Sequence, residues 1–277
     1  MRQKPRRCLW HFLLQIYASI HLKFKGDVII INLNQFFKEN PKVAIGFSGG
    51  VDSSYLLFAG LRSGADIQAY YAKAAFQPQF EFEEAKKLAH LIGAKLKIIE
   101  LDVLSNKTVL ANQADRCYHC KLAIFGSLVL SAKADGYSLM IDGTNASDDA
   151  SDRPGMKALT EMEVRSPLRE CGLTKDEIRR LSKEAGLFTW DKPSYACLAT
   201  RIPTGCAITG EILQRVEKAE DALFSLGFTD FRVRVFNDAA RLQFPESQMS
   251  TALEMKGRII EAMKPYFPII LLDLGGR

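Results

Sequence analysis

The stretch Val43-Ala-Ile-Gly-Phe-Ser-Gly-Gly-Val-Asp-Ser-Ser54 decides how this chain folds. Its first five residues have the apolar pattern of a buried β-strand, and the glycine pair that follows marks a tight turn into a helix. A strand that enters a helix through such a turn presents backbone N–H groups and the positive helix end to an anion. The stretch therefore predicts a phosphate-binding loop, formed by Ser48, Gly49, Gly50, Asp52, Ser53 and Ser54.

This loop differs from two other common nucleotide-binding motifs. It contains no GxxxxGK(S/T) sequence, so phosphoryl transfer of the Walker type is not expected. It also lacks the GxGxxG pattern of dinucleotide-binding folds. Its hydroxyl groups add hydrogen-bond donors, and Asp52 is placed to orient the loop or to help hold a phosphate-bound magnesium ion.

Strand and helix patterns alternate on both sides of the loop. Strands are expected at 43–47, 67–72, 96–101 and 139–142, and helices at 34–40, 53–63, 80–92, 120–134 and 174–185. This alternation predicts an α/β fold with a doubly wound parallel sheet. Residues 143–172 are expected to form a long polar loop followed by an irregular segment.

The C-terminal part of the chain has a different pattern. Helices are expected at 210–226 and 248–263, and strands at 231–235, 240–244 and 269–274. This order predicts a small α+β domain with an antiparallel sheet. We therefore expect a first domain over residues 28–204 and a second over residues 205–277.

The net positive charge of the chain lies in a short leader. Residues 1–27 contain six basic residues and one acid, so they carry the whole formal charge of +5 and the other 250 residues carry none. A neutral body gives no reason to expect a nucleic acid as partner. The leader is interpreted as an upstream extension, with an amphipathic helix or a signal peptide as alternatives. Because no run of eighteen apolar residues is present, we expect no membrane span and a cytoplasmic location.

Six cysteines are too few for a disulfide scaffold in a chain of 277 residues. Cys117 and Cys120 form a CxxC motif at the start of a helix, where two thiolates can hold one metal ion. Two ligands do not complete a zinc or iron–sulfur site, and Cys197 is the natural third. The other cysteines have no partner spacing and are expected to be structural: Cys8, Cys171 and Cys206.

Asp142 ends an expected strand and begins a polar loop. In a doubly wound sheet, ligands bind beyond the carboxyl ends of the strands. This loop is therefore expected to share a crevice with the phosphate-binding loop, and Asp142 is a candidate for the wall of the ATP or substrate site. A solvated acidic loop is the alternative.

Several segments together resemble the LarE family of PP-loop ATP pyrophosphatases. They are the phosphate-binding loop, DGTNASD (142–148), SDRPG (151–155), KPSYACLATRIPTG (192–205), VRVFNDAARL (233–242) and LLDLGG (271–276). The resemblance covers roughly residues 34–277 and leaves the leader outside. It implies an ATP-dependent sulfur transferase of nickel-pincer nucleotide cofactor biosynthesis. Such an enzyme adenylates a carboxylate of pyridinium-3,5-biscarboxylic acid mononucleotide, releases pyrophosphate and inserts sulfur to form the thiocarboxylate.

The resemblance also implies how sulfur is supplied. One form of the family sacrifices the sulfur of a single cysteine, and Cys197 occupies that position. The other form holds a 4Fe-4S cluster on three cysteines, which Cys117, Cys120 and Cys197 match. The CxxC motif favours the cluster, while a zinc site on the same ligands and a sacrificial Cys197 without any cluster remain alternatives.

Further site residues follow from the same resemblance. Arg232 and Arg234 lie two residues apart on one expected strand, so they point to the same face and match the positions that bind the substrate phosphate. Arg201 is a further phosphate candidate. Glu220 matches an acid near the active site, and the expected catalytic residues are Cys197, Asp52 and Glu220. Gln243 and Thr251 stand where the single-cysteine enzymes carry acids, which puts a site built from those acids in doubt.

The expected cofactors are ATP, Mg²⁺ and the 4Fe-4S cluster, and the expected partners are a small nucleotide substrate and a sulfur-donor system. The resemblance suggests a homo-oligomer, such as a hexamer. Three other functions stay open: a PP-loop tRNA thiolation enzyme, an amide-forming adenylating ligase, and a nucleotide-binding regulator without turnover. The ligase does not explain three cysteines, and tRNA binding needs clustered basic residues that the neutral body does not indicate.

Overall fold

The computed structural model describes residues 33–148 and 154–277. The predictions for the leader 1–27, Cys8 among them, lie outside the described residues. A short helix at 33–39 precedes the first strand, close to its predicted place at 34–40. Within the described ranges, no helix has both the length and the apolar character that a bilayer crossing needs.

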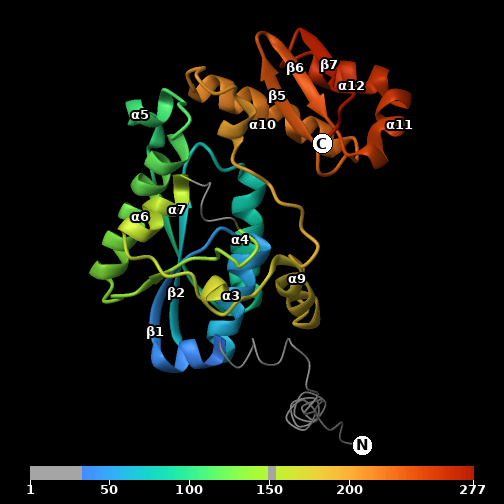
Figure 1. Cartoon of the computed structure of the whole chain (residues 1–277). Coiled ribbons are helices and arrows are strands. Elements are labelled where there is room, and N and C mark those ends of the chain that lie inside the picture. Colours follow the sequence, from blue (N-terminus) through green and yellow to red (C-terminus); the bar gives the residue numbers. More distant parts are fainter. Residues whose placement is uncertain (1–32, 149–153) are drawn as a thin grey trace, which may run out of the picture.

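A four-stranded parallel sheet forms the first part of the molecule (Figure 1). Its strands are β1 (Lys42–Gly46), β2 (Asp66–Lys73), β3 (Lys95–Glu100) and β4 (Met140–Ile141), in the order β3-β2-β1-β4. Each neighbouring pair runs parallel. The apolar run of β1 places Val43, Ala44 and Ile45 in the core, as expected for a strand covered on both faces.

Helices cover both faces of this sheet (Figure 1). The first face packs against α3 (Val51–Arg62), α4 (Gln79–Leu91) and α9 (Lys175–Glu184). The second face packs against α6 (Arg116–Ala134) and α7 (Pro154–Glu161). A parallel sheet with helices on both faces confirms the predicted α/β fold class. Thr174 and Glu177 form a capping box at the start of α9, where the sequence predicts a helix.

The segment expected to be irregular contains helices that the sequence pattern did not reveal. Besides α7, this segment contains the short helix α8 (Pro167–Glu170). Another short helix, α5 (Lys107–Leu110), lies earlier in the chain. Its N-cap is Asn106, whose side chain accepts hydrogen bonds from two backbone N–H groups. Helix α7 is only eight residues long, too short to be stable alone. It forms because Ala158 and Leu159 are buried in the fold.

The C-terminal part contains α10 (Gly210–Ser225), β5 (Arg232–Phe236), β6 (Ala239–Gln243), α11 (Glu246–Glu254), α12 (Lys256–Met263) and β7 (Ile269–Leu272). Strands β5 and β6 pair antiparallel, but β7 pairs parallel with β6. The prediction of an antiparallel sheet is therefore wrong for β7. Helices α11 and α12 lie between β6 and β7 and carry the chain back to the edge of the sheet at which β6 begins. Strand β7 therefore starts at the same edge as β6 and runs parallel to it. The single helix expected at 248–263 is divided at Met255.

One hydrophobic cluster joins the two parts of the molecule. Phe76, Val109 and Leu198 belong to the same cluster as Leu213 and Phe231 of the C-terminal part. Two 3₁₀ turns, η1 (Val103–Ser105) and η2 (Leu198–Arg201), lie in the segments that contribute to it. The predicted division at residue 205 thus crosses a shared core, and the two-domain description stays a prediction.

Candidate active site

The predicted phosphate-binding loop joins β1 to α3, with Gly50 as the N-cap of the helix. The Ser53 hydroxyl donates to the Gly50 carbonyl at 3.2 Å and accepts from the Ser48 backbone nitrogen at 3.3 Å. The Ser48 hydroxyl accepts from the Gly50 nitrogen at 3.3 Å. The Ser54 hydroxyl is buried and finds no partner among the described residues. The loop is therefore ordered around the positive end of α3, as anion binding requires.

Two glycines bring neighbouring segments against this loop. Gly49 has a φ of +74°, and a Cβ there would lie 2.8 Å from the Ala85 Cβ of α4. Gly143 follows β4, and a Cβ there would lie 2.8 Å from the Ser53 backbone nitrogen. Because neither residue has a side chain, α4 and the loop after β4 both contact the phosphate-binding loop. The two loops expected to share a crevice thus lie side by side.

Asp52 lies in the first turn of α3 and pairs with a lysine that the sequence analysis missed. Its Oδ2 accepts from Lys175 Nζ at 2.5 Å, across 123 positions of the chain. Its Oδ1 is buried and has no hydrogen bond within the described part of the chain. Burial raises the pKa of Asp52, and Lys175 opposes that rise. The unused Oδ1 suits the predicted contact with a phosphate-bound cation, which stays a prediction.

Asp142 is buried directly after β4, and both of its carboxylate oxygens are used inside the protein. Oδ1 accepts from Ser166 Oγ at 2.7 Å and from the Thr144 nitrogen at 3.3 Å, and Oδ2 accepts from Thr144 Oγ1 at 2.5 Å. These bonds fix the loop that contacts Ser53. Asp142 therefore supports the wall of the crevice, and its own contact with ATP stays a prediction.

The fold brings the three predicted cysteines near one another. Burial raises the pKa of Cys120 to about 12, and the charges of Cys197 and Cys117 add to the rise. Burial also raises the pKa of Cys197. Arg116 connects the two segments, because Nη2 donates to Cys117 Sγ at 3.7 Å and Nη1 donates to the Ala199 carbonyl at 3.0 Å.

This donor set fits a thiophilic metal or cluster in its chemistry, because zinc and the iron of iron–sulfur clusters prefer thiolate ligands. Within residues 33–148 and 154–277, however, no three His, Cys, Asp or Glu side chains are gathered closely enough to hold a metal ion. The metal ligands Cys117, Cys120 and Cys197 therefore stay a prediction. Cys171 and Cys206 carry free thiols elsewhere.

Helix α4 connects the phosphate-binding loop with the segment that carries Cys197. Its Ala85 touches Gly49, and its Phe80 packs edge-on against Tyr195 with ring centroids 4.9 Å apart. Five residues separate Ala85 from Phe80, which is about 8 Å along a helix axis. Lys192 adds ion pairs with two glutamates of the same helix. The two predicted chemical centres are thus held on one rigid element.

Arg201 and Glu220 form a buried ion pair next to this segment. Arg201 donates to Glu220 from Nε at 2.9 Å and from Nη2 at 3.0 Å, and its Nη1 donates to the Ala196 carbonyl at 2.8 Å. Glu220 also accepts from the Tyr195 hydroxyl and from the Val233 nitrogen at 2.9 Å. Both side chains are shielded from solvent, so neither reaches a ligand in this conformation. Their predicted roles in phosphate binding and catalysis stay predictions.

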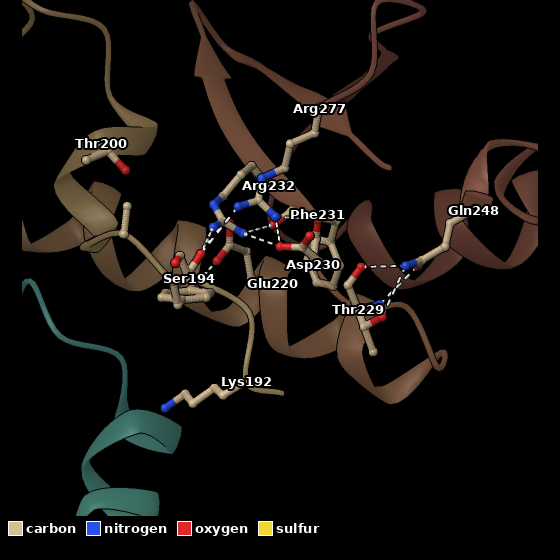
Figure 2. Close-up of polar contacts among 12 residues, drawn as sticks. Lys192, Ser194, Thr200, Glu220, Thr229, Asp230, Phe231, Arg232, Gln248 and Arg277 are labelled. Carbon is tan, nitrogen blue, oxygen red and sulfur yellow. Dashed lines mark hydrogen bonds and ion pairs between the residues drawn. The ribbon is translucent and has the colours of Figure 1, made fainter. Parts of the chain in front are cut away.

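Arg232 and Arg277 hold the other end of the Cys197 segment (Figure 2). Both donate to the Ser194 carbonyl, at 2.6 Å and 3.3 Å. Asp230 pairs with both guanidinium groups and adopts a positive φ of 52°. Burial lowers the pKa of both arginines. Sequence reasoning missed Arg277 and Asp230, because neither belongs to a sequence motif that indicates a binding or catalytic role.

Arg234 points to the same side of β5 as Arg232, as predicted. Its Nη1 donates to the Thr200 carbonyl at 2.8 Å, and its Nε donates to Gln243 at 2.5 Å. Gln243 in turn donates to Asp273 at 2.8 Å. Thr251 is exposed on α11, outside this network. The predicted phosphate face of β5 is therefore turned toward the Cys197 segment.

No family model matches the chain. A curated relative decides its family: pyridinium-3,5-bisthiocarboxylic acid mononucleotide synthase of Lactiplantibacillus plantarum is 34% identical over 242 residues, which are 86% of this chain and 88% of that protein. The chain belongs to the LarE family. The resemblance drawn from the sequence motifs is thereby confirmed.

Two further relatives are similar to this LarE family member, and one of them indicates its superfamily. An uncharacterized protein of Synechocystis is 37% identical over 251 residues, 88% of this chain and 93% of that protein. The tRNA-specific 2-thiouridylase MnmA of Thermotoga petrophila is 23% identical over 188 residues, 53% of this chain and 52% of that protein. The second match covers about half of each chain and supports the PP-loop superfamily.

Proposed function

We propose that this LarE family member is an ATP-dependent sulfurtransferase. It adenylates a carboxylate of pyridinium-3,5-biscarboxylic acid mononucleotide and then replaces the activated oxygen with sulfur, for the biosynthesis of the nickel-pincer nucleotide cofactor. The observation that carries the proposal is the match to the synthase of Lactiplantibacillus plantarum over most of both chains. The ordered loop at the start of α3 supports it, because adenylation requires the pyrophosphate of ATP to be bound as it leaves.

The order of the steps follows from carboxylate chemistry. A carboxylate resists a sulfur nucleophile, because its leaving group would be oxide. When a carboxylate oxygen attacks the α-phosphate of ATP, pyrophosphate leaves and an acyl adenylate forms; sulfur then attacks the carbonyl carbon and AMP leaves. Asp52 and the loop hydroxyls are proposed to hold the pyrophosphate and its Mg²⁺, while Arg232 and Arg234 supply positive charge for the substrate phosphate.

We further propose that Cys117, Cys120 and Cys197 hold a 4Fe-4S cluster. Such a cluster would supply a sulfide for transfer, and the three thiols would serve only as its ligands. The CxxC motif supports this route over a sacrificial Cys197, because the sacrificial route leaves Cys117 and Cys120 without a role. A sacrificial cysteine does not require the two partners or the Arg116 contact that joins their segments. A homo-oligomer, a cytoplasmic location and a separate sulfur-donor system complete the proposal.

One pair of measurements tests the function and the sulfur route together. Pyrophosphate release on mixing with ATP and the biscarboxylate nucleotide is expected, and its absence would contradict the adenylation step. Anaerobic reconstitution with iron and sulfide should give iron-dependent absorption in wild type and lose it in Cys117→Ala. Cys171→Ala is the matched control and should keep the absorption. A colourless wild type that transfers one sulfur per chain, with Cys197 losing the mass of hydrogen sulfide, would replace the cluster by the sacrificial route.

The match to the thiouridylase favours one second candidate, thiolation of tRNA. This activity needs a basic surface, because lysine and arginine side chains must neutralise the phosphates of the tRNA. Binding through such contacts weakens as the salt concentration rises. Residues 28–277 are neutral overall, which weakens the candidate. Retention of tRNA that decreases steeply with salt, together with thiolated uridine in the product, would establish it.

A further inference from the structure

Arg116, the first residue of α6, is a buried arginine that forms no ion pair with a carboxylate among the described residues. The two other buried arginines of this part of the chain each have such a partner: Arg201 pairs with Glu220, and Arg232 lies 4.0 Å from Asp230. A guanidinium keeps its charge in proteins, and a buried charge without a counter-ion destabilises a fold. The position of Arg116 therefore indicates a neighbouring anion other than the carboxylates described.

The guanidinium of this arginine is held by uncharged oxygens and lies beside a sulfur atom. Nη1 donates to Asn112 Oδ1 at 2.5 Å and to the Ala199 carbonyl at 3.0 Å, and Nη2 donates to Cys117 Sγ at 3.7 Å. The acid next to it in sequence, Asp115, turns its carboxylate to His119 Nε2 at 3.1 Å instead. The group that can become an anion beside this guanidinium is therefore the cysteine thiol.

Asn112 fixes the arginine in this place. It is buried, and its Nδ2 donates to the carbonyls of Pro203 at 2.8 Å and Cys206 at 2.9 Å. Its Oδ1 is the acceptor of Arg116 Nη1. The amide thus joins the start of α6 to the segment that follows η2, and the guanidinium belongs to a buried network rather than to the solvent.

The charge of Arg116 reaches the other two predicted ligands as well. Burial raises the pKa of Cys120 and of Cys197, and Arg116 opposes the rise at both thiols. Three thiolates bring three negative charges to one place, and a divalent metal ion or an oxidised 4Fe-4S core offsets two of them. One negative charge is left over, and one buried guanidinium can balance it.

We propose that Arg116 is the counter-cation of the sulfur centre formed by Cys117, Cys120 and Cys197. It balances the excess negative charge of the thiolate-bound metal or cluster, and through Nη1 it holds α6 against the Cys197 segment. It is a positioning residue, because it touches a ligand cysteine and not the substrate. The inference rests on the proposed function, since it assumes that the three cysteines bind one metal or cluster, and it adds the residue that sets the charge of that centre.

Two substitutions separate the charge from the hydrogen bonds. Arg116→Gln keeps a donor and removes the charge, while Arg116→Lys keeps the charge and loses the paired donors. Zinc affinity of the full chain, measured by competition with a chelator, should decrease by about 10- to 100-fold in Arg116→Gln, the size expected for a residue behind the ligands, and less in Arg116→Lys. Lys133→Gln, at an exposed position in the last turn of α6, is the matched control and should bind zinc as wild type does.

The reduction potential of the reconstituted cluster gives a readout that a purely structural residue would not move. After anaerobic reconstitution with iron and sulfide, the potential should be lower in Arg116→Gln than in wild type. Without the guanidinium, the electron enters a centre whose negative charge is not balanced, which favours the oxidised state. Arg116→Lys should stay closer to the wild-type potential.

A second pair of variants keeps the arginine in place. Asn112→Asp gives the guanidinium a carboxylate, whereas Asn112→Gly loses the same amide donors without adding charge. Glycine also suits the φ of 53° at this position. Zinc affinity should be lower in Asn112→Asp than in Asn112→Gly, because the new carboxylate competes with the thiolates for Arg116.

Three results would overturn the proposal. The first is equal zinc affinity and equal potential in wild type and Arg116→Gln. The second is an equal loss in Arg116→Gln and Arg116→Lys, which would leave Arg116 acting through its hydrogen bonds alone. The third is a wild type that binds neither zinc nor iron at the three cysteines. Pyrophosphate release in that same protein would leave the proposed adenylation standing, and its absence would contradict the proposed function instead.

Discussion

The Arg201 guanidinium and the Glu220 carboxylate form a two-bond ion pair that is closed off from solvent. Glu220 lies on α10 and Arg201 ends η2, so the pair fastens the Cys197 segment to the C-terminal part. A buried charge that loses its partner destabilises a protein far more than the intact pair stabilises it. This asymmetry makes the pair sensitive to single substitutions.

Glu220→Gln should lower the free energy of unfolding by about 3–5 kcal/mol, because it leaves the Arg201 charge buried without a counter-ion. Denaturant unfolding measures the loss. Glu211→Gln, at an exposed position of the same helix, is the control and should change stability little. If Glu220→Gln were as stable as wild type yet inactive, Glu220 would be catalytic rather than structural.

Lys175→Met should move the acid limb of pyrophosphate release to higher pH. Burial already raises the pKa of Asp52, and Lys175 is the group that opposes the rise. Without it the carboxyl takes up a proton at higher pH, and a protonated Asp52 no longer helps to hold a cation. The pH profile of pyrophosphate release measures the shift, with Lys183→Met on the same helix as control. Coincident profiles for Lys175→Met and wild type would show that Asp52 ionisation does not limit this step.

Gly49→Ala should abolish ATP binding and destabilise the fold, because φ is +74° and the new Cβ would lie 2.8 Å from that of Ala85. Gly64→Ala separates the two causes, since Gly64 has a φ of +79° and open space around it. That control should lose only the backbone cost of about 1–2 kcal/mol. Adding Ala85→Gly to Gly49→Ala should restore part of the stability. Thermal unfolding with and without ATP measures all three, and equal losses in the two single variants would contradict the close approach.

Arg277→Ala should slow sulfur transfer while leaving pyrophosphate release close to wild type. Its guanidinium donates to the carbonyls of Asp230 and Ser194, so its loss loosens the segment that carries Cys197 but touches no part of the phosphate-binding loop. Single-turnover assays of the two steps distinguish the effects. Arg258→Ala, at an exposed position of α12, is the control, and an equal decrease in both steps would indicate general destabilisation instead.

The local parts of the site could be predicted from the sequence, and the distant contacts could not. The loop at 48–54 follows from adjacent residues, since a strand, two glycines and a helix start form a continuous signal. The Asp52–Lys175 pair spans 123 positions, and Arg277 meets Ser194 across 83. Such pairs depend on how elements pack, which a single sequence does not display. The parallel pairing of β7 was missed for the same reason, because strand direction is set by the path of α11 and α12.

The Cys197 segment is held by its main chain as well as by its side chains. The carbonyl oxygens of Ser194, Ala196, Cys197 and Thr200 all accept hydrogen bonds from arginine side chains. Every residue type offers the same carbonyl, so this anchoring does not depend on the identity of the anchored residues. Substitutions at Ser194 and Ala196 would therefore keep these main-chain contacts, as long as the arginines that donate to them persist.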